Sequence, residues 1–155
     1  MTRSLLFTVL LALAACSARP PAPGPAAARA ALMAADRAFA AETATRGLDG
    51  WMDAYTSDAV RLHMGGSAAE GTVVHGHDAI RTFDANLFSD PGLQLTWEPT
   101  EAGVFADGRY GFTTGRSLLV RPATADTLHR GTYVTLWRRG ADGRWRVVLD
   151  TGAGD

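Results

Sequence analysis

The chain has 155 residues, of which 46% are hydrophobic and 20% charged, and its formal net charge is −1. This length suits a single domain, since one hydrophobic core is normal at about 100–150 residues. The balanced charge excludes the basic excess typical of nucleic-acid-binding proteins, so we expect no nucleic-acid partner. All 15 basic residues are arginine. The lack of lysine excludes Schiff-base chemistry on a protein lysine and a Walker-type phosphate loop.

The first residues predict an export signal that ends in a lipidated cysteine. Arg3 precedes an apolar run over residues 5–15, which is too short to span a bilayer but suits a signal peptide. The run ends in Leu-Ala-Ala-Cys at Cys16, the only cysteine, and resembles the bacterial lipobox. The resemblance implies cleavage before Cys16 and acylation of it, which anchors the protein in a lipid bilayer. An ordinary secretory signal with an incidental cysteine is the alternative.

The residues after the cysteine predict a tether. Ser17 stands where an aspartate favours inner-membrane retention, so the resemblance to lipoproteins of diderm bacteria implies an outer-membrane protein facing the periplasm. Residues 17–28 contain four of the seven prolines, a composition typical of semi-rigid linkers. We therefore divide the chain into a signal peptide (1–15), the lipidated cysteine with its tether (16–28) and a domain (29–155).

The first half of the domain predicts three helices. Apolar residues at spacings of three and four predict a helix over 29–47. A short second helix is expected over 48–55, with Asp49 as its N-cap, and a third over 78–88. Between the second and the third, residues 60–64 alternate in polarity like a short strand.

After Gly92 the apolar period changes to two, which predicts strands. The strands are expected at 93–98, 104–105, 110–120, 128–138 and 145–150, with tight turns at 107–108 and 142–143 and a bulge or edge at Pro99. Helices followed by consecutive antiparallel strands predict an α+β fold. We expect a cone-shaped domain in which three N-terminal helices pack on a strongly curved, mainly antiparallel sheet.

Three segments resemble a known family. They are ADRAFAAETATRGLDGWMDAYTSDAVRLH (35–63), the V-x-G-x-D-A-I pattern from Val74 to Ile80, and RGTYVTLWRRGADGRWRVVLDTG (130–152). Together they resemble the SnoaL-like, ketosteroid-isomerase-like group of the nuclear transport factor 2-like superfamily, most closely its members of unassigned function. The resemblance covers about residues 30–152. It implies the fold and not the chemistry, because this fold hosts isomerases, dehydratases, epoxide hydrolases and non-enzymatic proteins.

The resemblance also implies a pocket between the helices and the concave face of the sheet. Aromatic residues are the expected wall, and three polar residues are expected to point into it. The wall residues are Trp51, Tyr55, Phe83, Trp97, Phe112, Tyr133 and Trp137, and the polar residues are His63, Arg116 and Asp150. An apolar cavity with a few polar groups is typical of small-molecule sites. The alternative for each aromatic residue is that it only fills the core.

Asp150 is the main candidate for chemistry. It follows three apolar residues on an expected central strand, where a carboxylate needs a partner. If it faces the pocket, it is a candidate general acid or base, with His63 and Tyr55 as further catalytic candidates. Pairing with Arg116 would instead make Asp150 structural or ligand-orienting.

No metal or cofactor is indicated. His75 and His77 flank a glycine at a helix start, and no spacing of histidines supports a metal site. No glycine pattern has the strand–loop–helix order of a nucleotide-binding motif.

Three functions remain open from the sequence. The favoured one is a lipid-anchored domain that binds a small, largely apolar molecule. The second is a cofactor-independent isomerase, dehydratase or hydrolase that uses a pocket carboxylate as general acid or base. The third is an assembly role, because sheets of this fold commonly pair into homodimers.

Overall fold

The computed structural model describes residues 24–64 and 71–154. The predicted signal peptide, Cys16 and most of the predicted tether lie outside these residues. The elements, in chain order, are α1 (Pro25–Arg46), α2 (Leu48–Asp53), β1 (Tyr55–Met64), β2 (Thr72–His75), α3 (His77–Asp84), β3 (Gln94–Val104), β4 (Tyr110–Arg121), β5 (Asp126–Arg139) and β6 (Trp145–Gly154).

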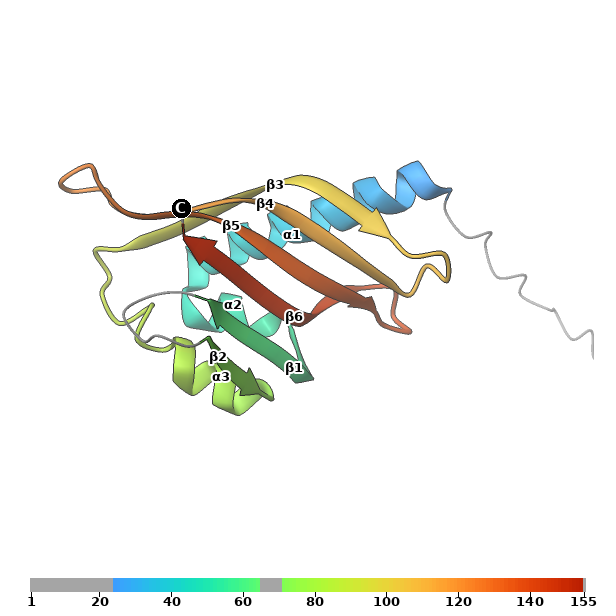
Figure 1. Ribbon diagram of the computed structural model, residues 1–155, viewed down its shortest axis with the longest axis horizontal. Helices are drawn as coiled ribbons and strands as arrows, with labels where there is room; N and C mark the ends of the chain where they lie inside the picture. The colour runs from blue at the N-terminus through green and yellow to red at the C-terminus, as the bar shows by residue number, and fades with distance from the viewer. Residues whose placement is uncertain (1–23, 65–70, 155) are drawn as a thin grey trace, which may run out of the picture.

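One six-stranded sheet forms the body of the domain, in the order β2-β1-β6-β5-β4-β3 (Figure 1). Neighbouring strands are antiparallel except β1 and β6, which run parallel. The helix α1 lies along one face of the sheet and packs mainly against β3. The predicted α+β fold is confirmed, although β1 and β2 precede α3 in the chain and β2 was not predicted. No helix in the described part of the chain is long and apolar enough to cross a membrane.

The two ends of α1 differ in how well the sequence predicted them. The helix begins at Pro25, before the expected boundary at residue 29, because a proline at the first helical position loses no hydrogen bond. It ends as expected at Gly47, whose φ of 58° favours glycine. The amide of Gly47 donates a hydrogen bond to the carbonyl of Thr43, which caps the helix. Gly47 is also the N-cap of α2, so the prediction of Asp49 in that role is wrong. Because one residue joins the two helices directly, Asp49 already lies in the first turn of α2.

The bulge predicted at Pro99 is confirmed, since the pairing of β3 with β4 shifts register between Pro99 and Glu101. Gly115 faces the carbonyl of Glu98 at this point, with no room for a side chain. Gly111, nearer the start of β4, lies directly beneath Leu32 of α1; a Cβ built at Gly111 would stand 2.7 Å from the Leu32 Cδ2 atom. Small residues on β4 therefore allow α1 to approach the sheet closely.

The core is formed by aromatic rings between α1, α2 and the sheet. The ring of Phe39 lies 4.9 Å from Trp51, 4.8 Å from Trp97 and 6.0 Å from Trp137, measured between ring centres. These separations, with mostly edge-to-face angles, are typical of favourable aromatic packing. The core therefore fills the space beneath the middle of the sheet and forms the floor of the site described next.

Candidate functional site

A cavity of about 1070 Å³ lies between α3 and the inner face of the sheet. It is formed by α3 and the residues after it, by the C-terminal ends of β1 and β6, and by the inner sides of β3, β4 and β5. Its principal side chains are Phe39, Trp51, Arg61, His63, Phe83, Asp84, Leu87, Leu95, Trp97, Leu119, His129, Tyr133 and Asp150. Its volume is near the upper end of the range for small-molecule sites, about 300–1000 Å³.

The cavity brings together six of the ten residues that the sequence predicted for the site. Four are aromatic, and two are polar. They are Trp51, Phe83, Trp97, Tyr133, His63 and Asp150. The imidazole of His63 packs against the ring of Phe83 at 5.7 Å between ring centres. The strand β1 and the helix α3 thus hold this pair at one side of the cavity.

Two predicted pocket residues lie on the other face of the sheet. Ser117 and Leu119 of β4 line the cavity, so Phe112 and Arg116, of opposite parity on the same strand, point away from it. Their prediction as pocket residues is wrong. The inner face of β4 carries small residues where α1 packs against it, so the larger side chains of this strand lie outside.

Tyr55 and Trp137 are buried in the core and do not line the cavity. The indole of Trp137 donates to the hydroxyl of Thr113 at 2.8 Å. The hydroxyl of Tyr55 is buried and has no hydrogen-bond partner among the described residues. Burial, with the charge of Asp150 nearby, raises the pKa of Tyr55 well above its ordinary value. Tyr55 therefore stays protonated. Because its side chain does not line the cavity, the structure does not support the predicted catalytic role.

Asp150 is buried and faces the cavity, but its partner is not the predicted Arg116. In the sheet, Asp150 lies opposite Arg61 of β1 and opposite Thr135 of β5. The Arg61 Nη1 atom donates to Asp150 Oδ2 at 2.7 Å, and the Thr135 hydroxyl donates to Oδ1 at 2.7 Å. Because both carboxylate oxygens accept a strong bond, Asp150 is held as a fixed counter-ion of Arg61.

Asp84, at the end of α3, supplies a second carboxylate on the other side of Arg61. Its Oδ2 atom accepts a hydrogen bond from the indole of Trp51 at 2.9 Å and lies 3.5 Å from Arg61 Nε. The Arg61 Nε atom is buried and makes no hydrogen bond within the described residues. Burial raises the pKa of Asp84, and Arg61 opposes this only in part. We call Arg61, Asp84 and Asp150 the charged cluster; it has one cation for two carboxyl groups.

Asp36 of α1 joins two walls of the cavity from below. Its Oδ1 atom accepts from the indole of Trp97 at 2.7 Å, and Oδ2 accepts from the hydroxyl of Tyr133 at 2.8 Å. Burial raises the pKa of Asp36, and the hydrogen bonds lower it in part. The Tyr133 hydroxyl is thus already committed as a donor. Its role is to fix the aromatic wall and not to donate to a ligand.

The sequence analysis missed three of these residues, although the patterns contained a signal for each. Asp36 and Asp84 stand four residues after the buried Leu32 and Ile80, on the apolar faces of their helices. Arg61 stands two residues before His63, so strand alternation places it on the same face. A charged residue on an apolar face predicts a buried polar network.

His75 ends β2, and His77 begins α3. Within residues 24–64 and 71–154, no group of three His, Cys, Asp or Glu side chains could hold a metal ion. The Nε2 atom of His77 lies 3.2 Å from the carbonyl of Met52 and so links α3 to α2. The N-cap of α3 is Gly76, without a side-chain bond.

The buried carboxyl groups predict an unusual dependence of stability on pH. Asp36 and Asp84 have pKa values raised above the ordinary 3.8, so the folded state binds their protons more tightly than the unfolded chain. The free energy of unfolding is therefore expected to rise as the pH falls from 7 towards about 4. Below that it should fall, because Arg138 and Arg146 hold the pKa values of Asp58 and Asp142 at about 2.

Urea unfolding followed by tryptophan fluorescence between pH 7 and pH 3 measures this profile. Asp84→Asn should flatten the rise, because it removes one of the two groups responsible. Asp78→Asn changes the charge equally at an exposed position on the same helix and should leave the rise intact. A stability that falls steadily from pH 7 to pH 4 in the parent protein would contradict the assignment.

A family model for the SnoaL-like domain matches residues 35–148. The chain therefore belongs to the SnoaL-like domain family. Among proteins of curated function, no sequence matches it.

Solved structures of the same fold come from several bacteria, and one of them holds a bound compound. A ketosteroid isomerase-like protein from Erwinia carotovora atroseptica has 18% identity and a TM-score of 0.62, covering 81% of this chain and 94% of that one. An NTF2-like protein of unknown function from Pseudomonas putida has 15% identity and a TM-score of 0.66, covering 84% and 89%. A Catenulispora acidiphila protein in complex with S-DNPA has 16% identity and a TM-score of 0.62, covering 81% and 92%. At these identities the likeness shows the fold alone.

Proposed function

We propose that this protein is an exported lipoprotein whose domain binds a small, largely apolar molecule in the cavity, while acylated Cys16 holds it at a membrane. The observation that carries the proposal is the cavity itself. Most of its surface is apolar, and its charged side chains, Arg61, Asp84 and Asp150, lie together as the charged cluster. That distribution suits a ligand with an apolar body and one polar group. The complex of the Catenulispora acidiphila protein with S-DNPA supports ligand binding by this fold.

The polar group of the ligand is expected to meet Arg61 and Asp84. Asp150 already accepts two strong bonds, and Tyr133 donates to Asp36. Asp84 is bonded through Oδ2, by the indole of Trp51. A hydroxyl or carbonyl group of the ligand near Asp84 and Arg61 would complete the hydrogen bonding of this cluster.

Binding of a neutral aromatic probe, N-phenyl-1-naphthylamine, tests the cavity directly. We expect the parent protein to bind it with an increase in fluorescence. Ser117→Trp should weaken binding at least about tenfold, because the indole fills space that the ligand would occupy. Thr132→Trp places the same indole on the exposed face of β5 and serves as the control. Equal affinities for the parent and Ser117→Trp would place the probe elsewhere and contradict the proposal.

The anchor has its own test. Replacing Cys16 with serine removes the only sulfur that can be acylated and should move the protein from the membrane fraction to the soluble fraction of its host. The measurement is fractionation followed by intact-mass determination, which shows whether the parent chain carries acyl groups. Continued membrane retention of Cys16→Ser, or an unacylated parent chain, would contradict lipidation.

The second candidate function is a cofactor-independent isomerase, dehydratase or hydrolase. It is favoured by the charged cluster, which places two carboxyl groups of different environment beside one cavity. Burial raises the pKa of Asp84, whereas Asp150 is fixed by Arg61 and Thr135. Asp84 is therefore the better candidate for proton transfer, and Asp150 is the group that orients Arg61.

Asp84→Asn distinguishes catalysis from binding. In an enzyme this variant should retain substrate while the parent protein retains product, so the co-purified molecules would differ. For a dehydratase their masses differ by one water, for a hydrolase the product is the substrate plus one water or a fragment of that sum, and for an isomerase their fragmentation or retention differs. A binding protein should carry the same molecule in both forms. Asp78→Asn, on the exposed side of α3, is the matched control.

A further inference from the structure

Six of the thirteen arginines in residues 29–155 lie at the end of the domain where α1 begins. The β3–β4 turn (105–109) and the β5–β6 turn (140–144) lie at this end, beside the start of α1 (Figure 1). The amide of Arg139 donates to the carbonyl of Arg109 at 2.7 Å, which joins the two turns, and Leu32 lies over Gly111 at the start of β4. We call this the arginine end, with Arg29, Arg109, Arg138, Arg139, Arg144 and Arg146.

The charges of the arginine end are only partly balanced. Arg138 forms a bidentate pair with Asp58 at 2.9 and 3.0 Å, and Arg146 pairs with Asp142 at 2.7 Å. The carboxylate of Asp107 accepts from the amide of Arg109 within its own turn.

The other four arginines are exposed and form no ion pair with any residue in 24–64 or 71–154. They are Arg29, Arg109, Arg139 and Arg144. Phe105, in the same turn region, is 51% exposed.

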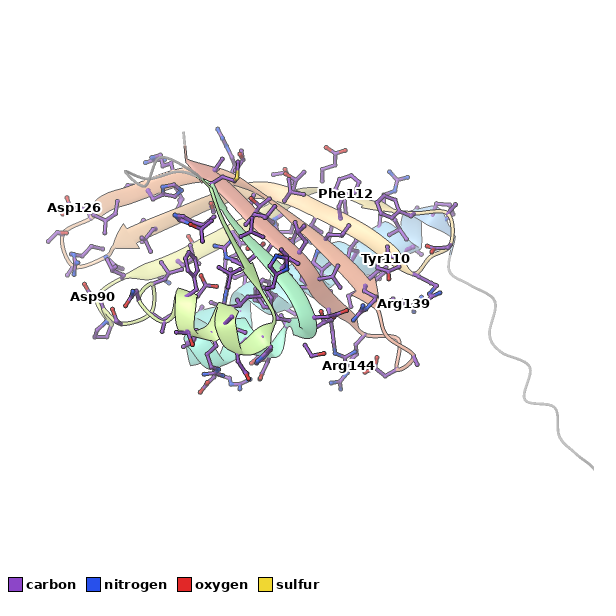
Figure 2. The ribbon with its side chains drawn as sticks, turned by 60° about the horizontal axis from the view of Figure 1, so that its bottom comes forward. Asp90, Tyr110, Phe112, Asp126, Arg139 and Arg144 are labelled. Carbon is purple, nitrogen blue, oxygen red and sulfur yellow. The ribbon has the colours of Figure 1, made fainter. Side chains whose placement is uncertain are left out.

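The opposite end of the domain carries the cavity and holds arginines as well as aspartates: Asp90 pairs with Arg121 at 2.8 Å, and Arg130 contacts Thr127, next to Asp126. Figure 2 shows Asp90 and Asp126 at one end of the molecule and Arg139 and Arg144 at the other. Cavity residues such as Leu95 and Leu119 lie at the far ends of β3 and β4 from the 105–109 turn. At about 3.3 Å per strand residue, they are roughly 30 Å from it. The excess of positive charge is therefore confined to the arginine end, while the charges near the cavity end offset one another.

We propose that the arginine end binds the anionic headgroups of a lipid bilayer, which orients the domain with its cavity away from the membrane. This inference rests on the membrane anchoring proposed above. The chain between Cys16 and Gly24 reaches at most about 30 Å when extended, so it holds the start of α1 near the bilayer surface. Arginines at that surface are attracted by anionic lipids, and an exposed aromatic ring such as Phe105 suits the interface.

The orientation has a consequence for the ligand. With the arginine end on the bilayer, the far wall of the cavity, at Leu95 and Leu119, lies on the aqueous side, some 30 Å from the headgroups. A ligand then enters from the aqueous compartment or from a soluble carrier, and not directly from the membrane that holds the protein.

Vesicle binding by the unacylated mature chain tests this contact separately from lipidation. The chain from residue 16 with Cys16→Ser keeps every described residue. We expect it to bind vesicles of one part phosphatidylglycerol to three parts phosphatidylcholine at 25 mM NaCl, to bind pure phosphatidylcholine vesicles far more weakly, and to be released by 500 mM NaCl.

Charge reversal identifies the residues. Arg139→Glu with Arg144→Glu should lower the partition coefficient at least about 25-fold, since each arginine near an anionic surface contributes roughly fivefold. Arg81→Glu with Arg130→Glu changes the net charge equally away from the arginine end, and should change binding by less than about threefold. Unchanged binding by the first pair, or equal binding to both vesicle types, would overturn the proposal.

Discussion

Replacing Arg61 with leucine is expected to lower the free energy of unfolding by about 3–5 kcal/mol at pH 7. The guanidinium is the cation that faces both Asp84 and Asp150, at 3.5 and 2.7 Å. Without it, two carboxyl groups remain buried side by side with no cation between them. The cost of burying unpaired charge is large because the protein interior solvates ions poorly.

The measurement is urea unfolding of the parent and Arg61→Leu at pH 7 and pH 4.5, followed by tryptophan fluorescence. Lower pH should reduce the difference, because burial raises the pKa of Asp84 and its protonation removes part of the uncompensated charge. Arg81→Leu is the control, since its ion pair with Asp49 is exposed and should contribute less than about 1 kcal/mol. A loss below about 1 kcal/mol for Arg61→Leu would show that the cluster is not the buried network described above.

Replacing Gly111 with alanine is expected to cost about 1–3 kcal/mol through overpacking. The new Cβ atom would stand 2.6 Å from the carbonyl oxygen of Gly103 and 2.7 Å from Leu32 Cδ2. The carbonyl belongs to the neighbouring strand and cannot move without breaking the sheet. The backbone pairing of β3 with β4 would therefore be distorted, and the Leu32 side chain would have to repack over β4.

Gly152→Ala is the matched control, because its Cβ would lie at an ordinary contact distance of 3.4 Å from the Thr132 carbonyl. Thermal or urea unfolding of the two variants gives the comparison. Equal stabilities of Gly111→Ala and Gly152→Ala would mean that α1 does not press on β4 as the structure indicates.

The position of Gly111 also explains where prediction from the sequence failed. Alternation along β4 was predicted correctly, but alternation alone does not say which face is inside. The aromatic Phe112 and the polar Arg116 looked like pocket residues. The inner face instead carries glycine, threonine and serine, because the helix and the cavity occupy the space there.

For Asp150, burial could be predicted from the sequence, but its hydrogen-bond partner could not. Its position after three apolar residues correctly predicted a buried carboxylate that needs a partner. The partner followed from the parallel pairing of β1 with β6, which places Arg61 opposite Asp150. This pairing joins residues 89 positions apart, and no local pattern encodes it. The fold class, the helices and most strands, by contrast, follow from local periodicity and were predicted.

Most aromatic residues of the cavity wall, with His63 and Asp150, were predicted, whereas Asp36 and Asp84 were not. Asp36 and Asp84 occupy helix positions that the apolar periodicity assigns to the core. Their role depends on partners that are distant in the sequence. Asp36 accepts hydrogen bonds from Trp97 and Tyr133, and Asp84 contacts Trp51 and Arg61. A buried network is a property of the assembled fold.

Native mass spectrometry of the protein purified from its own host under mild conditions tests ligand binding most directly. The proposal predicts a non-covalent adduct of a few hundred daltons in the parent protein, consistent with a cavity of about 1070 Å³. The adduct should be absent from Ser117→Trp, which fills the cavity, and present in Thr132→Trp. A parent protein without any adduct, or an adduct carried equally by Ser117→Trp, would contradict the account.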